Sequence, residues 1–465
     1  MQLFHTPPVA SAVFDEPNLV SAAGLVPLMA LARRAGLAQL ADRWLSVPTD
    51  KGANAGVKVC SLVAGMAAGA DSIDDMAVLR HGGTARVLGA SPAPSTLGSF
   101  LRAMTFGHVR QLDAVASRFL VALANDTRIL GAPEARSAVM VDLDDTIVEV
   151  HGHHKQGAAF GYSGVRGLNA ILATVSTDTV APVVVAQRLR KGNAGSSRGV
   201  TRLVRDALAT TRRTHLAGRA VLVRADSAFY SRALVGPAIK AGADVSVTVR
   251  MDPVVKRAIA TISDDAWTTI RYPQAIYDET TGTWVSKAQV AEIAFTAFSS
   301  KKPAEQVPGR LVVRRIPDVN ARAGAGQATL FETWWFHAFF TTTDLDTVTA
   351  DQVHRRHAVI ENVHADLKNS ALAHLPSGKF TANAAWLVLA VMAFNLTRAA
   401  ATLADTTMAK ATTTTIRRKL VHVPARVASS ARRVTLHLPT AWPWENAWTT
   451  LFTGLCAPPP AALAT

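Results

Sequence analysis

The amino-acid sequence predicts an α/β fold, in which a mixed core lies between a helical N-terminal domain and a basic C-terminal region. Three observations lead to this prediction. Apolar residues recur at helical spacing before residue 135, strands rich in Val and Ala alternate with helices from about residue 137, and acidic residues are absent between Asp405 and Glu445. The chain has 465 residues, of which 49% are hydrophobic. That length and composition allow roughly two to four domains and a sizeable core.

Residues 1–135 are predicted to form the helical domain. The segments 25–45 and 59–80 repeat apolar residues at helical spacing, and no valine-rich strand interrupts them. A short helix carrying Arg102 is predicted at 96–104, where Pro94 supplies a start signal. A helix-turn-helix-like segment of this kind would suit DNA binding. A helical domain that only packs against the rest of the chain is the alternative.

Residues 136–249 alternate strands and helices. Three strands come first, followed by helix, strand, helix and strand, which is the order of an RNase H-like fold. In that fold the first strand and the strand after the first helix each carry a metal-binding Asp, and Asp144 and Asp226 fall at those places. The predicted strands are 137–143, 168–176, 181–189, 219–226 and 244–250, and the predicted helices are 198–214 and 231–243.

The remaining residues are predicted to form three further parts. Residues 250–347 are rich in β-branched and aromatic residues and are interpreted as a β-rich insertion in the core. Residues 348–404 return to the core as helices, with a break near Pro376 and Gly378. Residues 405–465 form the basic C-terminal region.

The charge balance indicates a polyanionic partner. The chain has 49 Lys and Arg against 34 Asp and Glu, a formal net charge of +15 at pH 7. Nucleic acid is the expected polyanion. The cysteines, Cys60 and Cys456, are far apart in the sequence, which argues against a disulfide framework or a zinc ribbon and fits a reducing cytoplasm.

No membrane partner is expected. The N-terminal segment carries Asp15 and Glu16 and has no basic region followed by an apolar one, so it does not fit a secretory signal. The most apolar stretch, Ala382–Leu396, is shorter than a bilayer span and contains Asn383 and Asn395. We interpret that stretch as a buried helix.

Three carboxylates occupy contexts that fit one nuclease-like metal site. Asp144 and Asp226 follow predicted strands, and Glu361 lies on a predicted helix. Mg²⁺ prefers oxygen ligands, and two Mg²⁺ ions about 3.5–4 Å apart stabilise both the attacking and the leaving oxygen of a phosphodiester displacement. We therefore expect two Mg²⁺ ions, for which Mn²⁺ can substitute. Asp142 is the alternative to Asp144, because the two share one face of a strand.

A polar stripe supports the choice of Glu361. Side chains three or four residues apart lie on one face of a helix, and here they are His354, His357, Glu361, His364 and Lys368. A stripe of this polarity needs an anionic or metal partner. A zinc site is the alternative interpretation, since His and Glu ligate zinc. The HExxH pattern is absent, however, and the two Asp residues suit Mg²⁺ better.

Basic and aromatic residues predict where DNA would bind. A cluster between the third and fourth strands includes Arg190 and Lys191, and the basic block of the C-terminal region includes Arg417 and Arg418. Clusters of this kind neutralise phosphates. Trp284 in the insertion is a candidate for stacking on an unpaired base, with core packing as the alternative.

Five motifs occur across most of residues 60–440: DLDDT (142–146), GYSGVRGLNAIL (161–172), LRKGNAGSS (189–197), RADSAFYS (224–231) and HAVIENVHADLK (357–368). On these motifs the chain resembles a DDE transposase of a bacterial insertion sequence. It is most similar to insertion-sequence family 1380, in the broader insertion-sequence family 4 clan. Each motif alone is weakly specific, whereas the combination is specific.

The resemblance also concerns the polar helix. The helix signature of the clan runs Tyr, two residues, Arg, three residues, Glu, six residues, Lys. Measured from Glu361, Lys368 matches, whereas His354 and His357 stand at the Tyr and Arg places. We expect these two histidines, with Lys368 and the neighbouring Arg356, to contact DNA phosphates.

The resemblance implies a catalytic triad of Asp144, Asp226 and Glu361 with two Mg²⁺ ions. It implies cleavage at the ends of an element and joining of those ends to target DNA. The expected partners are the terminal inverted repeats and target DNA, with a homodimer in the synaptic complex, in the bacterial cytoplasm near the nucleoid. Two alternatives stay open: a metal-dependent DNA nuclease of the same fold, and a domesticated, transposase-derived DNA-binding protein.

Overall fold

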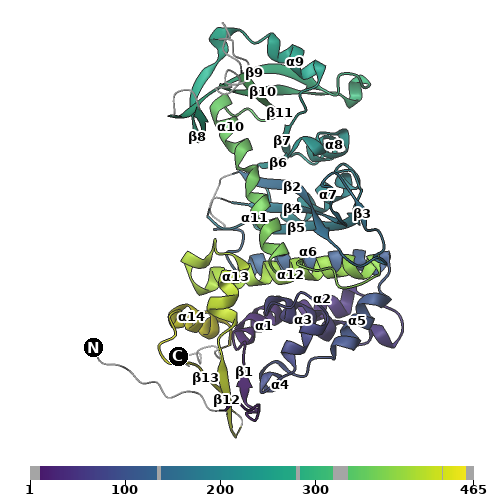
Figure 1. Cartoon of the computed structure of the whole chain (residues 1–465), viewed down its shortest axis with the longest axis vertical. Coiled ribbons are helices and arrows are strands. Elements are labelled where there is room, and N and C mark those ends of the chain that lie inside the picture. Colours follow the sequence, from purple (N-terminus) through teal and green to yellow (C-terminus); the bar gives the residue numbers. More distant parts are fainter. Residues whose placement is uncertain are drawn as a thin grey trace, which may run out of the picture.

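A computed structural model of the chain describes residues 11–132, 138–177, 179–278, 283–317, 334–431 and 433–456, with the backbone alone for 271–276, 278 and 283–287. The described residues form the predicted mixed α/β fold. Figure 1 shows three parts stacked along the long axis. A β-rich part that carries α9 (Pro253–Ala260) is at one end, strands β2, β4 and β5 lie in the middle, and the N-terminal helices are at the other end.

One mixed sheet extends through the central and β-rich parts. Its strand order is β3-β4-β2-β6-β7-β11-β10-β9-β8, and β5 also pairs with β4. β2, β6 and β7 are parallel, whereas β4, β5 and the strands from β11 to β8 are antiparallel to their neighbours. The strands are β2 (Val139–Glu149), β3 (Ala159–Phe160), β4 (Arg166–Ser176), β5 (Val183–Lys191), β6 (Val221–Ala225), β7 (Asp244–Thr248), β8 (Thr268–Asp278), β9 (Thr283–Ala297), β10 (Val307–Pro317) and β11 (Trp334–Thr341).

β2 is longer than the sequence predicts. The predicted strand ends at Leu143, but β2 pairs with β4 as far as Glu149 opposite Gly167. The strand continues through the acidic residues because Ile147 and Val148 beyond them are buried in the core. Asp144 therefore lies within a strand and not at its end.

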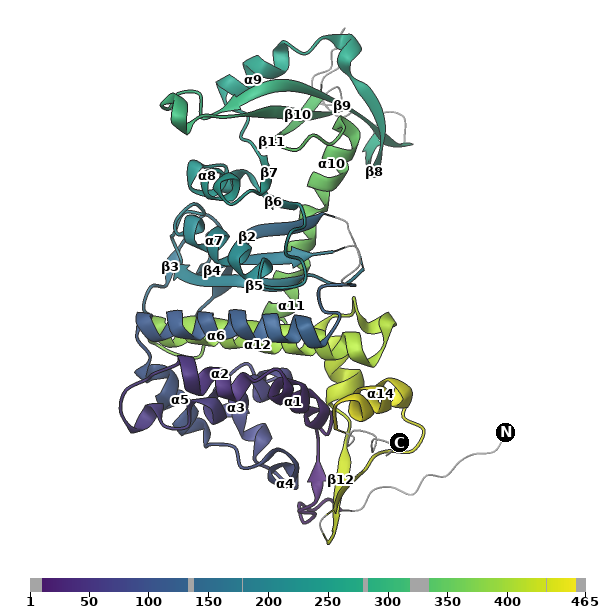
Figure 2. The same ribbon diagram turned by 180° about the vertical axis from the view of Figure 1, so that it is seen from behind.

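Helices cover both faces of the central sheet. α7 (Val200–Thr211) and α8 (Arg232–Lys240) form the connections from β5 to β6 and from β6 to β7, as predicted. α10 (Thr347–Arg355) leads into α11 (Val359–Lys368), which packs against β2. α7 and α11 lie on opposite sides of the sheet in both Figure 1 and Figure 2.

The path from α10 to α11 is not one continuous helix. A 3₁₀ turn, Arg356–Ala358, separates the two helices, whereas the sequence predicts a break only near Pro376. Arg224 of β6 donates a hydrogen bond to the carbonyl oxygen of Val353. In an α-helix that oxygen would accept from the N–H of His357, so the arginine competes with the helical hydrogen bond and explains the break.

The N-terminal helices pack around α12 (Phe380–Ala404). The predicted helix at 96–104 is α5, in which Pro94 occupies the first turn and Leu97, Phe100 and Leu101 are buried. Figure 2 shows α6 and α12 side by side beneath β5, with α1, α2 and α3 on their other side. The N-terminal helices are α1 (Leu25–Arg34), α2 (Leu37–Trp44), α3 (Ala55–Ala67), α4 (Thr84–Leu88), α5 (Pro94–Ala103) and α6 (Phe106–Asp126).

α12 is the predicted buried helix. By length and composition it is apolar enough to cross a membrane, but 89% of its most apolar window is buried inside the protein, as expected for a core helix that is apolar on all sides. Asn395 bonds both backbone groups of Val184, at 3.1 Å to the N–H and 2.8 Å to the carbonyl. Asn395 thus attaches α12 to the start of β5 without leaving its buried amide unpaired.

The C-terminal region folds back on the N-terminal helices. The hairpin of β12 (Ala425–Ser430) and β13 (Arg433–His437) extends from β1 (Leu19–Val20) in a separate sheet. α14 (Glu445–Cys456) packs against α1 and α12. α13 (Thr413–Ile416) and the π-helical turn Arg417–Val421 connect α12 to the hairpin. The sequence predicted only a basic region here.

Candidate active site

Asp144 and Asp226 lie side by side on neighbouring strands. β2 and β6 are parallel and in register up to Leu143 opposite Ala225, which makes Asp144 and Asp226 the next residues on strands about 4.8 Å apart. The Asp226 carboxylate accepts a hydrogen bond from the N–H of Ala228 at 3.1 Å. Burial, and next the negative charge of Asp144, raise the pKa of Asp226. Two partly buried carboxylates that repel each other fit a hard cation, which would neutralise both.

Asp142 is engaged in a structural ion pair. Its side chain is 0% exposed, and the guanidinium of Arg224 donates to both carboxylate oxygens, at 2.6 and 2.8 Å. His357 Nδ1 lies 3.3 Å from the same carboxylate. Burial alone would raise the pKa of Asp142, but the hydrogen bonds from His357 and Arg224 hold it below its ordinary value. These contacts favour Asp144 over Asp142 as the metal ligand.

Glu361 lies on the strip of α11 that faces Asp142 and Asp144 of β2. It is four residues after His357, which contacts Asp142, and three before His364, whose Nε2 is 3.5 Å from Asp144 Oδ2. Glu361 is exposed and lines a cavity of about 950 Å³ beside α11. In the described part of the chain no three His, Cys, Asp or Glu side chains converge into a metal-holding group. In this structure Glu361 therefore does not converge with Asp144 and Asp226 into one such group.

His364 is the residue of the polar stripe that lies nearest to Asp144. Its side chain is 8% exposed, and neither ring nitrogen has a hydrogen-bond partner among the described residues. A buried imidazole without partners is costly unless something else satisfies it. The sequence placed His364 in the stripe but gave it no role, because periodicity alone does not show which strand residue it faces.

His354 is bound to the sheet by both of its ring nitrogens. Its two ring nitrogens are hydrogen-bonded to Ser246 Oγ at 2.8 Å and Thr248 Oγ1 at 3.0 Å, and its ring stacks on Phe339 at 4.0 Å. Burial lowers the pKa of His354 well below its ordinary value. In this structure the histidine attaches α10 to the sheet, and its predicted phosphate contact stays a prediction.

The other predicted phosphate contacts on these helices differ in exposure. Arg356, in the 3₁₀ turn before α11, and Lys368, at the last residue of α11, are exposed. Burial lowers the pKa of Lys368. His357 is mostly buried against Asp142. Arg356 and Lys368 are therefore the members of this set that a strand of DNA can reach.

Arg190 belongs to a buried network and not to the protein surface. Its side chain is 5% exposed and pairs with Asp145 on the face of β2 opposite Asp144. It also donates to Asn169 Oδ1 at 2.9 Å and to the carbonyl oxygens of Ser196 and Arg198 at 2.9 and 3.0 Å. This side chain holds the loop after β5 in the structure, and its predicted DNA contact stays a prediction. Lys191 is exposed.

Two further predicted DNA contacts lie on the π-helical turn. Arg417 is half-buried and its Nε donates to the carbonyl oxygen of Ala67 at 3.2 Å, so it joins the C-terminal region to α3. Arg418 is exposed, with its guanidinium 6.0 Å from the ring centroid of Trp444. The side chain of Trp284 lies outside the described residues.

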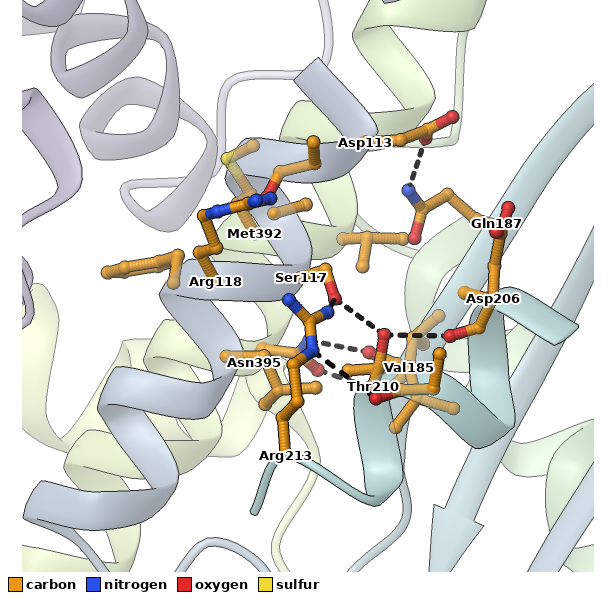
Figure 3. Close-up of a pocket in the computed structure, with 18 of the residues that line it drawn as sticks. Asp113, Ser117, Arg118, Val185, Gln187, Asp206, Thr210, Arg213, Met392 and Asn395 are labelled. Carbon is orange, nitrogen blue, oxygen red and sulfur yellow. Dashed lines mark hydrogen bonds between the residues drawn. The ribbon is translucent and has the colours of Figure 1, made fainter. Parts of the chain in front are cut away.

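A second, smaller cavity of about 250 Å³ lies between α6, β5, α7 and α12. Figure 3 shows Asp113 and Gln187 bonded at 2.8 Å, and Arg213 beside Ser117 and Thr210. Arg110 pairs with Asp113 at 2.6 Å and with Asp206 at 2.9 Å. The charged groups pair with one another across the junction of the N-terminal helices and the central sheet, which indicates a structural role.

Comparisons with known proteins identify a family for this chain. A search of the curated proteins finds no match to this chain. A family model described as transposase DDE domain group 1 matches residues 5–458. The matched stretch covers nearly the whole chain, and the mixed α/β fold with its large sheet is compatible with such a domain. The chain belongs to the transposase DDE domain group 1 family.

Proposed function

We propose that this protein is a DNA transposase that cuts the ends of an insertion sequence and joins them to target DNA by two-metal phosphoryl transfer. The observation that carries the proposal is the pair formed by Asp144 and Asp226 on adjacent parallel strands, with Glu361 on the facing strip of α11. The family membership supports DNA as the substrate. We also propose that the protein is a member of insertion-sequence family 1380, which its motifs resemble.

The catalytic core is proposed to be RNase H-like. The strand order β5-β4-β2-β6-β7, with β6 and β7 parallel to β2, supports it. So does the placing of α7 and α8 between the last three of these strands. On this view β8 to β11 are the insertion, which continues the sheet beyond β7.

Asp144, Asp226 and Glu361 would hold the metal. When bound, Mg²⁺ or Mn²⁺ would lower the pKa of the attacking water or hydroxyl and stabilise the charge on the leaving oxygen. The protein keeps the ligands in place: the ion pair between Asp142 and Arg224 ties β2 to β6, and Arg224 also reaches Val353 of α10. We propose that water attacks first and that the freed 3′-hydroxyl then attacks target DNA.

Phosphate contacts are assigned to the exposed basic residues Lys191, Arg356, Lys368 and Arg418. The net charge of +15 supports this choice. A homodimer is proposed for the synaptic complex, as the resemblance implies. A metal-dependent nuclease of the same fold is the second candidate, because the same carboxylates would cut DNA without joining it.

The experiment uses the full chain, labelled DNA that carries the terminal inverted repeats flanking its gene, and a supercoiled target plasmid. With Mg²⁺ we expect cleavage at the element end and a joined product. Asp144→Ala, Asp226→Ala and Glu361→Ala should abolish both while DNA binding persists, because the basic contacts remain. Asp265→Ala, at an exposed position in the insertion, is the matched control and should stay active.

The outcome separates the candidates. Cleavage without a joined product would identify a nuclease. DNA binding without cleavage in any divalent metal would identify a DNA-binding protein. Activity that survives EDTA, or that only Zn²⁺ restores, would reject the carboxylate site in favour of the histidine stripe.

A further inference from the structure

Tyr162 is an exposed aromatic residue beside the carboxylate pair. It lies in the turn between β3 and β4, and 82% of its side chain is exposed. Partial burial and the negative charges of Asp145, Asp144 and Asp226 raise the pKa of its hydroxyl.

The turn that carries Tyr162 is held against its neighbour. Gly161 approaches the loop after β5 so closely that a Cβ on it would be 2.6 Å from the carbonyl oxygen of Gly192. Gly164 has φ +68°, which closes the turn through a hydrogen bond from its N–H to the carbonyl of Gly161 at 3.1 Å. The position of Tyr162 is therefore fixed by the backbone at both ends of a short turn.

Tyr162 forms one wall of a cavity of about 390 Å³. The other residues that line it include Thr146 to Glu149 of β2 and Lys368 at the end of α11. Met140, four residues before Asp144 on β2, lines the larger cavity beside Glu361. Thr146 lies two residues after Asp144 on the same face of β2 as Met140. Asp144 is therefore situated between the cavity beside Glu361 and the cavity beside Tyr162.

The lining of the cavity of about 390 Å³ beside Tyr162 suits one nucleotide. An ammonium group at Lys368 attracts a phosphate, and an exposed ring stacks on a base of any identity. Glu149 at the outer end lies 3.9 Å from His151 Nδ1 and would repel a second phosphate there. The charge pattern thus favours a phosphate near α11 and an uncharged base near the β3–β4 turn.

We propose that the nucleotide next to the scissile phosphate occupies the cavity lined by Tyr162 and Lys368, and that Tyr162 stacks on its base. This inference rests on the proposed function, since it takes the cut strand to pass across Asp144 and Asp226. The base that Tyr162 contacts must be unpaired or partly unstacked from its neighbour.

The test uses element-end DNA that carries the fluorescent base 2-aminopurine at the nucleotide next to the cleavage site, bound to the full chain in Ca²⁺. We expect quenching by the wild type and by Tyr162→Phe, which keeps the ring. Tyr162→Ala should restore emission and weaken binding about tenfold, the effect of one lost stacking contact. Phe160→Ala is the matched control, because Phe160 is 67% exposed on the same hairpin and is not part of the described cavity lining.

A second measurement replaces the same nucleotide by an abasic site. The wild type and Tyr162→Ala should bind this DNA equally, since neither has a base to stack on. The proposal is overturned if Tyr162→Phe loses as much as Tyr162→Ala, if Phe160→Ala has the same effect, or if the abasic site leaves the difference unchanged. A failure of the proposed function would appear separately, as wild-type protein that does not cut DNA in Mg²⁺.

Discussion

Two aspartates two residues apart on β2, Asp142 and Asp144, have different surroundings. Asp142 is enclosed by Arg224 and His357, whereas Asp144 has a partly exposed side chain beside Asp226. The sequence could not separate them, because the arginine that occupies Asp142 is 82 residues away in the chain. Strand periodicity shows only that both face the same side.

This difference predicts opposite effects of two alanine substitutions. Asp142→Ala leaves Arg224 buried without its partner and should lower the free energy of unfolding by about 3–5 kcal/mol. Asp144→Ala should leave stability nearly unchanged and abolish cleavage. Urea unfolding and the DNA cleavage assay, applied to both variants, check this. A stable Asp142→Ala protein that no longer cuts DNA, together with an active Asp144→Ala protein, would reverse our assignment.

A second prediction concerns His364. Its ring lies beside Asp144 Oδ2 and has unpartnered nitrogens among the described residues, so it is positioned to orient that carboxylate. Loss of a residue that orients a metal ligand costs about 10–100-fold in metal affinity. We expect His364→Ala to weaken Mn²⁺ binding by this factor, measured by electron paramagnetic resonance without DNA. His374→Ala, at a surface position paired with Asp71, should bind Mn²⁺ as the wild type does.

At the scale of the elements, the sequence predicted the five core strands, α7, α8 and the buried helix α12. Their signals are local: runs of Val and Ala for the strands and apolar residues on all sides for α12. The break between α10 and α11 and the extension of β2 were missed. Both depend on contacts between distant segments, namely Arg224 with Val353 and β2 with β4.

The sequence also could not show which of the basic residues are buried by contacts with distant segments. The sequence grouped Arg190, Lys191 and Lys368 as phosphate contacts, because composition shows charge and not burial. The structure separates Arg190, whose charge is matched by Asp145 in the interior, from the exposed lysines. An adjacent pair such as Arg190 and Lys191 points to opposite faces of β5, so only one of them can be outside.

This separation predicts different phenotypes for two substitutions. Lys368→Ala should reduce the dependence of log binding constant on log salt by about 0.9, the value for one phosphate contact, with normal stability. Arg190→Ala should leave the salt slope unchanged and destabilise the fold, since it leaves Asp145 buried and unpaired. Binding to element-end DNA at several salt concentrations, with thermal unfolding of each variant, makes the comparison. Equal salt slopes for Lys368→Ala and wild type would mean that Lys368 faces only water.

At the scale of the whole molecule, the N-terminal helices, α12 and the C-terminal region form one packed unit beneath the central sheet (Figure 1). The cavity around Asp113 lies at the junction of this unit with the sheet, where α6 meets α7 and β5. Arg110 bridges Asp113 and Asp206 across the junction. The two parts are thus joined by partly buried charges in addition to apolar packing, and their attachment should depend on pH.

The last prediction concerns the sign of that dependence. Burial, opposed by Arg110, raises the pKa of Asp113 from 3.8 to about 6. Because the folded state holds this proton more tightly than the unfolded chain, the contribution to stability is complete below about pH 4 and is lost as the pH rises through about 6. The loss is of the order of 1–3 kcal/mol.

Asp113→Asn cannot ionise, so its stability relative to wild type should rise between about pH 4 and about pH 7, measured by urea unfolding at several pH values. Asp50→Asn, at an exposed position, should follow the wild type throughout. If the curves of wild type and Asp113→Asn run parallel across this range, Asp113 is ionised in the folded protein at low pH and Arg110 outweighs its burial.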